Sequence, residues 1–376
     1  MPQWTVHLEG GPRRVNHAAV AVGDKIYTFG GYCTGEDYQT TRPMDVHVLN
    51  TVSYRWVSIA TPTPLDPQWA DTPYQRYGHT AVAVGDCAYI WGGRNDVDGA
   101  CNVLFCINTV TMKWSRPLVN KDMIPGARDG HSACVINNNM YIFGGYEEAV
   151  DRFSNDVHGL DFATLTWSLM KAKGSPPHWR DFHSATGFGS CMYIFGGRGD
   201  LSGPYHTSNE VYCNKIQVFN TLTGMWHEPV TIGDAPPGRR SHSAFSYRGE
   251  LYIFGGFDGF HNIHFDDLYK FNPVKNQWSL VSVGNEGPCP RRRQCCCVIG
   301  DRVFLFGGTS PCTQPHSDTE LDLMDHSDLY VLDLSPSLCT LCMLVVLKHG
   351  IDRSCLPKDI RYNAYSKAVV PLPSQR

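Results

Sequence analysis

The sequence predicts an all-β protein in which six four-stranded antiparallel sheets close into a ring. Three observations carry this prediction. A strand-like apolar run ending in Gly-Gly recurs at intervals of 52 to 62 residues, a Trp follows most of the doublets, and an Arg-x-x-His precedes most of them. The second glycines of the doublets are Gly31, Gly93, Gly145, Gly197, Gly256 and Gly308. Because a single four-stranded sheet cannot cover both of its faces, we expect the six units to pack against one another and leave no long free edge.

Each unit is expected to contain four short strands in a fixed order. The first strand begins at Arg-x-x-His, and the second is the aromatic run into Gly-Gly. The third is a segment such as "NDVHGLDFAT", and the fourth carries the Trp. Alternating apolar residues between Gly, Asn and Pro turns support antiparallel strands. The Arg-x-x-His pairs are Arg14 and His17, Arg76 and His79, Arg128 and His131, Arg180 and His183, Arg239 and His242, and, with Cys in place of His, Arg292 and Cys295.

The sixth unit has no Trp strand after "SDLYVLDL", whereas Trp4 in "QWTVHLEG" precedes the first Arg-x-x-His. We therefore predict that residues 3–8 supply the fourth strand of the last unit and close a six-bladed β-propeller. The propeller is expected to span residues 1–334. A short helical docking segment over 335–365 and a flexible tail over 366–376 are expected to follow it.

Composition limits the function classes. With 42% hydrophobic and 18% charged residues, the chain of 376 residues can bury a large core, and its net charge of -4 disfavours a general nucleic-acid or membrane-surface binder. The start "MPQWTVHLEGG" lacks the pattern of a secretory signal. We expect the 15 cysteines to be reduced core thiols in the cytoplasm or nucleus, with no metal and no cofactor.

The expected strand directions place a binding site at one mouth of the ring. The residues after each Gly-Gly and around each Arg-x-x-His lie at the same face. A residue repeated in every unit is expected to serve the fold, as an inter-blade hydrogen-bonding or packing group, whereas a residue particular to one unit is a candidate for binding. The unit-specific candidates are Arg94, Arg198, Arg240 and Arg293, with Ser241, Trp179, Tyr77, Asp129 and Asp181 nearby. Clustered arginines suit an anionic ligand such as a carboxylate, although pairing with Asp129 and Asp181 is the alternative.

The Gly-Gly doublet, the Trp 21 to 29 residues after it and the period near 52 resemble kelch repeats over residues 1 to 334. Some kelch propellers are copper oxidases, whose chemistry needs Tyr and His ligands that converge on one face. Here the histidines are spread one to a unit, and the unit-specific residues include arginines, which repel a metal. The chain also lacks the short catalytic motifs of hydrolases and metalloproteases. We therefore expect a binding protein without catalytic residues.

The segment "SPSLCTLCMLVVLKHGIDRSCLPKDI" departs from the repeats. We predict a helix that begins at Ser335-Pro336, carries an apolar stripe and ends at Gly350. The apolar run is too short to span a bilayer, which needs about 20 residues. Leu338, Cys342 and Val346 resemble the BC-box that docks on elongin C, and Leu356, Pro357 and Ile360 resemble a cullin-2 box.

The two boxes behind a kelch propeller resemble the kelch substrate receptors of cullin-2 ubiquitin ligases. The resemblance implies elongin B/C and cullin-2 with its RING subunit as partners, and the capture of substrate C-termini that end in glycine. It assigns the carboxylate to arginines such as Arg198 and Arg240. As an extension, Asp129 and Asp181 are expected to read a basic residue upstream of that glycine.

A second reading is a nuclear chromatin-binding kelch protein, similar to the propeller half of a recombination-activating protein. Arg291–Arg293 supply candidate phosphate contacts for it. The acidic balance of the chain disfavours this reading.

Overall fold

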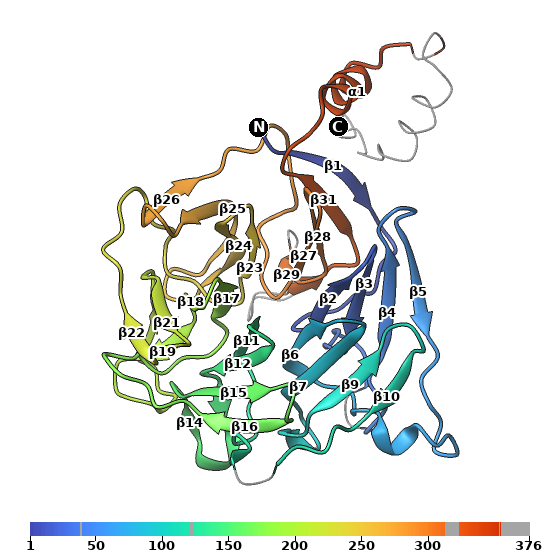
Figure 1. Ribbon diagram of the computed structural model, residues 1–376. Helices are drawn as coiled ribbons and strands as arrows, with labels where there is room; N and C mark the ends of the chain where they lie inside the picture. Colours follow the sequence, from blue (N-terminus) through green and yellow to red (C-terminus); the bar gives the residue numbers. More distant parts are fainter. Residues whose placement is uncertain (38–39, 121–122, 313–322, 353, 355–376) are drawn as a thin grey trace.

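Six four-stranded antiparallel sheets surround a central axis in the computed structural model, which describes residues 1–37, 40–120, 123–312, 323–352 and 354 (Figure 1). We call these sheets blades 1 to 6. From the axis outward their strands are, in blade 1, β2 (Ala18–Val22), β3 (Lys25–Phe29), β4 (Val46–Asn50) and β5 (Arg55–Ile59); in blade 2, β6 (Tyr77–Val84), β7 (Cys87–Asn95), β9 (Phe105–Asn108) and β10 (Lys113–Ser115); in blade 3, β11 (Ser132–Ile136), β12 (Asn139–Phe143), β15 (Val157–Asp161) and β16 (Thr166–Leu169); in blade 4, β17 (Ser184–Phe188), β18 (Cys191–Phe195), β21 (Gln217–Asn220) and β22 (Met225–His227); in blade 5, β23 (Ser243–Tyr247), β24 (Glu250–Asp258), β25 (Ile263–Asn272) and β26 (Gln277–Leu280); and in blade 6, β27 (Cys295–Ile299), β28 (Arg302–Phe306), β31 (Leu329–Asp333) and β1 (Gln3–Leu8).

The innermost strands contact one another in a closed series from β2 through β6, β11, β17, β23 and β27 back to β2. The ring is completed by β1, which pairs antiparallel with β31 so that Trp4 lies opposite Leu332. The predicted six-bladed propeller, closed by an N-terminal strand, is therefore confirmed.

Short elements decorate the ends of the blades. They are β8 (Gly99–Ala100) beside β7, the hairpins β13 (Tyr146–Glu147) with β14 (Arg152–Phe153), β19 (Arg198–Asp200) with β20 (Glu210–Tyr212), and β29 (Thr309–Pro311) with β30 (Leu323–Asp325), and the 3₁₀ turns η1 (Trp69–Asp71) and η3 (Glu148–Val150).

The Trp motif and the Gly-Gly motif meet at the blade interfaces. In every blade the Trp of the outer strand packs on the aromatic residue that precedes Gly-Gly in the blade before it. The pairs, with ring centroids 5.2–6.2 Å apart, are Trp4 with Phe254, Trp56 with Phe306, Trp114 with Phe29, Trp167 with Trp91, Trp226 with Phe143, and Trp278 with Phe195. Aromatic contacts of this kind stabilise beyond their buried area, and they explain why the two motifs recur together.

The repeated Arg and His serve the fold, as expected. Arg76 is 1% exposed, and its Nη1 donates to the carbonyl oxygen of Gly92 at 3.3 Å in its own blade. The Nε2 of His79 lies 3.0 Å from the carbonyl oxygen of Phe29 in the preceding blade. Burial and the charge of Arg76 lower the pKa of His79 to about 3, so the ring is neutral. His17 is different, because neither of its ring nitrogens has a hydrogen-bond partner among the described residues.

The Gly-Gly doublets need glycine for steric reasons. Gly93 has a φ of +81°, and a Cβ added to it would lie 2.6 Å from the Cβ of His79. Its amide donates to the carbonyl oxygen of Arg128 in the next blade at 2.9 Å. The doublet thus brings two blades together at a distance that a side chain would prevent.

After β31 the chain leaves the ring and forms α1 (Leu338–Lys348), which stands away from the blades in Figure 1. The predicted N-cap at Ser335 is wrong. Ser337 is the cap, because its Oγ accepts from the amide of Thr340 at 3.1 Å. At the other end Gly350 has a φ of +60°, and the amides of Gly350 and Ile351 donate to Leu347 and Val346, which ends the helix as predicted. Among the described residues, no helix is long and apolar enough to cross a membrane.

Candidate functional site

One face of the ring is built by six short backbone bridges. In each blade the residue after the buried Arg pairs with the residue after Gly-Gly, so the start of the innermost strand and the end of its neighbour lie together. The pairs are Val15 with Tyr32, Tyr77 with Arg94, Asp129 with Tyr146, Asp181 with Arg198, Arg240 with Phe257, and Arg292 with Thr309. We call the face that carries these pairs the mouth.

The sixth unit differs from the prediction by one residue. The buried repeated arginine is Arg291, which is 1% exposed and donates from Nη1 to the carbonyl oxygen of Gly307 at 3.2 Å, as Arg76 does to Gly92. Gln294 replaces the His, and its Nε2 donates to the carbonyl oxygen of Phe254 at 3.1 Å. The expected pairing of Arg292 with Cys295 is therefore wrong. Three consecutive arginines in "PRRRQCCC" hide the register in the sequence.

Two arginines of the sixth unit therefore occupy other positions than expected. Arg292 takes the mouth position that Arg240 holds in blade 5, and Arg293 takes the next position, on the axis. The axial residues form a closed ring in which each amide donates to the carbonyl oxygen of the preceding one at 2.7–3.3 Å, and all have positive φ. They are Asn16, Gly78, Gly130, Phe182, Ser241 and Arg293. A cavity of about 120 Å³ lies along this ring, which forms the floor of the mouth.

Two of the predicted cations are neutralised by neighbours. Arg198 forms a bidentate pair with Asp181, with Nε 3.1 Å from Oδ1 and Nη2 2.5 Å from Oδ2, and its Nη1 lies 3.5 Å from Glu210. Arg94 lies 3.3 Å from Glu148 and 4.0 Å from Asp96. Arg94 and Arg198 are therefore paired with carboxylates of the mouth, which was the alternative to ligand binding.

The other cationic side of the mouth lacks such partners. Within the described residues, no ion pair is formed by Arg240, Arg292 or Arg293, which we call the arginine cluster. The Nε atoms of Arg240 and Arg292 are buried and have no hydrogen-bond partner in the described part of the chain. The guanidinium carbons lie over the ring of Phe257 at 5.5 Å for Arg240 and 4.1 Å for Arg292.

The positive charges of the arginine cluster repel one another. Burial, followed by the charges of Arg293 and Arg240, lowers the pKa of Arg292 to about 9. Burial and Arg240 also lower the pKa of Arg293. Like charges held close together in a partly dry site favour the arrival of a counter-anion. Arg292 was not among the residues predicted to bind a carboxylate, although Arg291–Arg293 were candidate phosphate contacts in the second reading, and the corrected register places it at the mouth.

The opposite wall is acidic and aromatic. Asp129 is 6% exposed, and its carboxylate forms no hydrogen bond or ion pair with another described residue. Burial and the nearby Asp181 raise its pKa to about 7. Tyr77 donates from its hydroxyl to Asp96 at 2.7 Å. Trp179 is partly exposed, and its carbonyl oxygen lies beside Gly199 in the β19–β20 hairpin.

The predicted docking residues lie on the far side of the ring. Asp333, where β31 ends, pairs with Arg302 beside the turn between β27 and β28, so α1 begins at the face opposite the mouth. Leu338 is 76% exposed, Cys342 is exposed and Val346 is partly exposed. No residue of α1 is buried, although the helix is almost entirely apolar. The predicted cullin-2 box, Leu356, Pro357 and Ile360, lies outside the described residues, as does the predicted tail.

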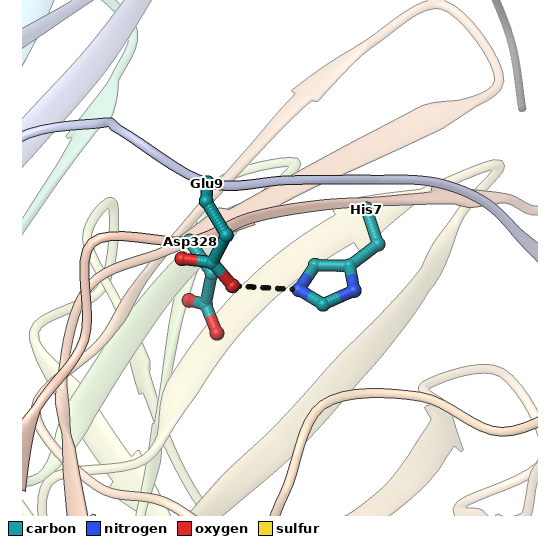
Figure 2. Close-up of side chains that lie close together, drawn as sticks. All are labelled: His7, Glu9 and Asp328. Carbon is teal, nitrogen blue, oxygen red and sulfur yellow. Dashed lines mark hydrogen bonds and ion pairs between the residues drawn. The ribbon is translucent and has the colours of Figure 1, made fainter. Parts of the chain in front are cut away.

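Two groups of side chains contain potential metal ligands, and neither fits a metal site. His7, Glu9 and Asp328 lie close together, with His7 Nε2 3.1 Å from Glu9 (Figure 2). Both oxygens of Asp328, however, accept from Arg291 at 2.6 and 2.8 Å, and a guanidinium at that position repels a cation. Cys339 and Cys342 form a Cys-x-x-Cys pair on α1, which supplies two ligands of the four that a structural zinc site needs.

Comparisons with known proteins identify kelch repeats in the part of the chain that forms the blades. The family model described as the KLHDC2/KLHL20/DRC7 Kelch-repeats domain matches residues 78–308, and the Kelch motif model matches residues 13–63. Kelch domain-containing protein 3 from Bos taurus and from Homo sapiens are each 58% identical over 363 residues, which is 96% of this chain and 95% of theirs. Host cell factor from Drosophila melanogaster is 30% identical over 77% of this chain, although the match covers 20% of that longer protein. The chain therefore belongs to the kelch-repeat family.

Proposed function

We propose that this chain is the substrate-recognition subunit of a cullin-2–elongin B/C ubiquitin ligase. In this proposal the mouth binds proteins through a free C-terminal carboxylate that follows a terminal glycine, and α1 joins the chain to the ligase. The proposal rests above all on one observation, the arginine cluster at the mouth, which forms no ion pair with any residue that the structure describes.

A peptide carboxylate suits this cluster chemically. Guanidinium groups hold a carboxylate through two parallel hydrogen bonds, and such charge-assisted bonds are stronger than neutral ones. Arg240 and Arg292 form no ion pair with another described residue, and their buried Nε atoms have no hydrogen-bond partner there, so their charges are left uncompensated by this part of the chain. A terminal glycine, which has no side chain, suits a carboxylate site beside the closely spaced axial residues, which include Ser241 and Arg293.

The arginines predicted from the sequence have different roles in this proposal. Arg240 and Ser241 remain at the carboxylate, and Arg292 and Arg293 join them. Arg198 acts mainly through Asp181, since its guanidinium is already engaged. The carboxylate of Asp129 forms no hydrogen bond or ion pair with another described residue. We propose that it accepts a hydrogen bond from a basic side chain or an amide upstream of the terminal glycine.

The exposed helix supports the ligase half of the proposal. Leu338, Cys342 and Val346 lie on α1, whose apolar side chains are left uncovered. A contiguous exposed apolar surface generally marks an interaction site. Its position opposite the mouth would leave the substrate entrance open while α1 is bound to elongin.

The carboxylate half is tested by peptide binding. A peptide ending in glycine is titrated against the full chain and against Arg292→Ala, with Arg248→Ala as the matched control. Arg248 is a 64% exposed arginine paired with Asp301 away from the mouth. Loss of a desolvated charge pair is expected to cost about 2–5 kcal/mol. C-terminal amidation should weaken binding similarly. Equal affinity of the acid and amide peptides would refute carboxylate recognition.

The ligase half is tested separately. The double change Leu338→Ala/Cys342→Ala is expected to abolish co-purification with elongin B/C and to leave peptide affinity unchanged, because α1 is remote from the mouth. Undiminished elongin binding by the double variant would contradict the BC-box assignment.

A further inference from the structure

A cysteine with polar neighbours and an adjacent cavity lies away from the mouth, at the junction of blades 5 and 6. Cys289 is exposed and stands at the edge of a cavity of about 460 Å³. The cavity is bounded by Trp4 of the closing strand, by Phe254 and Leu268 of blade 5, and by the connection that leads to β27. A small molecule therefore has space directly beside this thiol.

The thiol belongs to a cluster of polar groups. Its Sγ lies 3.6 Å from Nε2 of His326 and 3.3 Å from Nη2 of Arg291. Arg291 is fixed by its two hydrogen bonds to Asp328. The Nδ1 of His326 lies 3.8 Å from Asp328, and Ser310 Oγ lies 2.8 Å from its Nε2. The imidazole and the guanidinium are thus held in place beside the sulfur by groups on β29 and before β31.

The surroundings favour the thiolate. Although the residue is exposed, partial burial of its side chain raises the pKa of the Cys289 thiol, but the hydrogen bond from His326 and the charge of Arg291 outweigh this and bring the pKa down to about 7. The other titratable group that faces it is Tyr330 on β31. Cysteines in the core behave in the opposite way, because burial raises the pKa of Cys134 to about 12.

We propose that Cys289 is a nucleophilic site for small, uncharged, soft electrophiles such as α,β-unsaturated carbonyl compounds, with the adjacent cavity receiving the body of the electrophile. In the reaction the sulfur forms a bond to the β-carbon, the carbon–carbon double bond is lost, and the α-carbon takes up one proton. The overall change is a one-to-one addition without a leaving group, oxidant or reductant. His326 is a positioning residue that stabilises the thiolate.

The lining of the cavity limits the electrophile. Asp266, Asp267 and Glu286 line it. Asp267 is paired with Arg239, whereas Asp266 and Glu286 form no ion pair with another described residue, so their charges disfavour an anionic compound. A neutral compound meets no such repulsion, and the apolar side chains of Phe254 and Leu268 favour its organic part.

The experiment uses the full chain and acrylamide as the probe. The rate of adduct formation at each cysteine is measured by peptide mass spectrometry between pH 5.5 and 9.5. Cys339, an exposed thiol on α1, is the internal control. A thiolate with a pKa near 7 is present at about half occupancy at pH 7, against a few per cent for an ordinary thiol, but it is intrinsically less nucleophilic. The net expectation is roughly three- to sixfold faster labelling of Cys289 at pH 7.

The pH midpoint of labelling is the sharper test, because accessibility alone does not move it. The midpoint for Cys289 is expected near pH 7, and His326→Gln should move it upward, while Cys289→Ser removes this adduct and leaves that of Cys339. A Cys289 midpoint in the wild-type chain that coincides with that of Cys339, or labelling of Cys289 no faster than Cys339 at pH 7, would overturn the proposal without recourse to any variant.

Discussion

Replacing Asp129 by Asn is expected to stabilise the propeller at neutral pH and to do so less at acidic pH. The carboxyl group is 6% exposed, and burial together with Asp181 raises its pKa from 3.8 to about 7. The other charged groups that face it are Arg94, Glu148 and Arg198, and they do not cancel this effect. Asn has nearly the same shape and carries no charge at any pH.

The magnitude follows from the two pKa values. Below pH 4 the carboxyl is protonated in the folded and unfolded chains alike. As the pH rises from 4 to 7 the unfolded chain loses this proton while the folded chain keeps it, so the wild-type chain loses stability; above 7 both are ionised and the loss is complete. Three pH units at 1.36 kcal/mol each amount to about 4 kcal/mol in total, of which about 2–3 kcal/mol falls between pH 5 and pH 8.

The assay is urea unfolding followed by tryptophan fluorescence at pH 5, 6, 7 and 8. The difference in free energy of unfolding between Asp129→Asn and wild type is expected to grow in favour of the variant by about 2–3 kcal/mol across this range. Asp66→Asn, at an exposed aspartate in the loop before β6, is the control. A difference for Asp129→Asn that stays constant from pH 5 to pH 8 would refute the reasoning.

Three further changes test the architecture. Trp4→Ala should lower the free energy of unfolding by about 3–5 kcal/mol in chemical denaturation, because it removes the aromatic contact of the closing strand, whereas Trp69→Ala in η1 should have little effect. Gly93→Ala should lower the free energy of unfolding by several kcal/mol. Gly85 also has a positive φ, of +57°, but nothing lies near its added Cβ, so Gly85→Ala should lower it by about 1–2 kcal/mol. Equal losses would show that crowding against His79 is not the cause. Ser337→Ala should cost α1 about 1 kcal/mol, seen as faster hydrogen exchange in its first turn, and unchanged exchange would contradict the cap assignment.

Much of the fold could be predicted because each blade repeats the same local chemistry. Gly-Gly, the aromatic residue before it and the Trp after it recur at fixed places, so their roles follow from one unit to the next. Because the sixth unit has no Trp strand of its own, the segment around Trp4 was predicted to supply it, and β1 does pair with β31. The helix was predicted from its apolar run, although its cap is Ser337 and not Ser335.

The candidate site could be predicted less completely, because it depends on which side chains meet. The sequence alone determined that arginines and carboxylates gather at one face of a closed ring. Only the tertiary structure decided that Arg198 forms an ion pair with Asp181. It also decided that Arg292 and Arg293 lie beside Arg240, with no ion-pair partner among the residues that the structure describes. The reason is physical: a repeat fixes the backbone position of a residue, whereas the neutralisation of a charge depends on distances of a few ångströms between side chains from different blades.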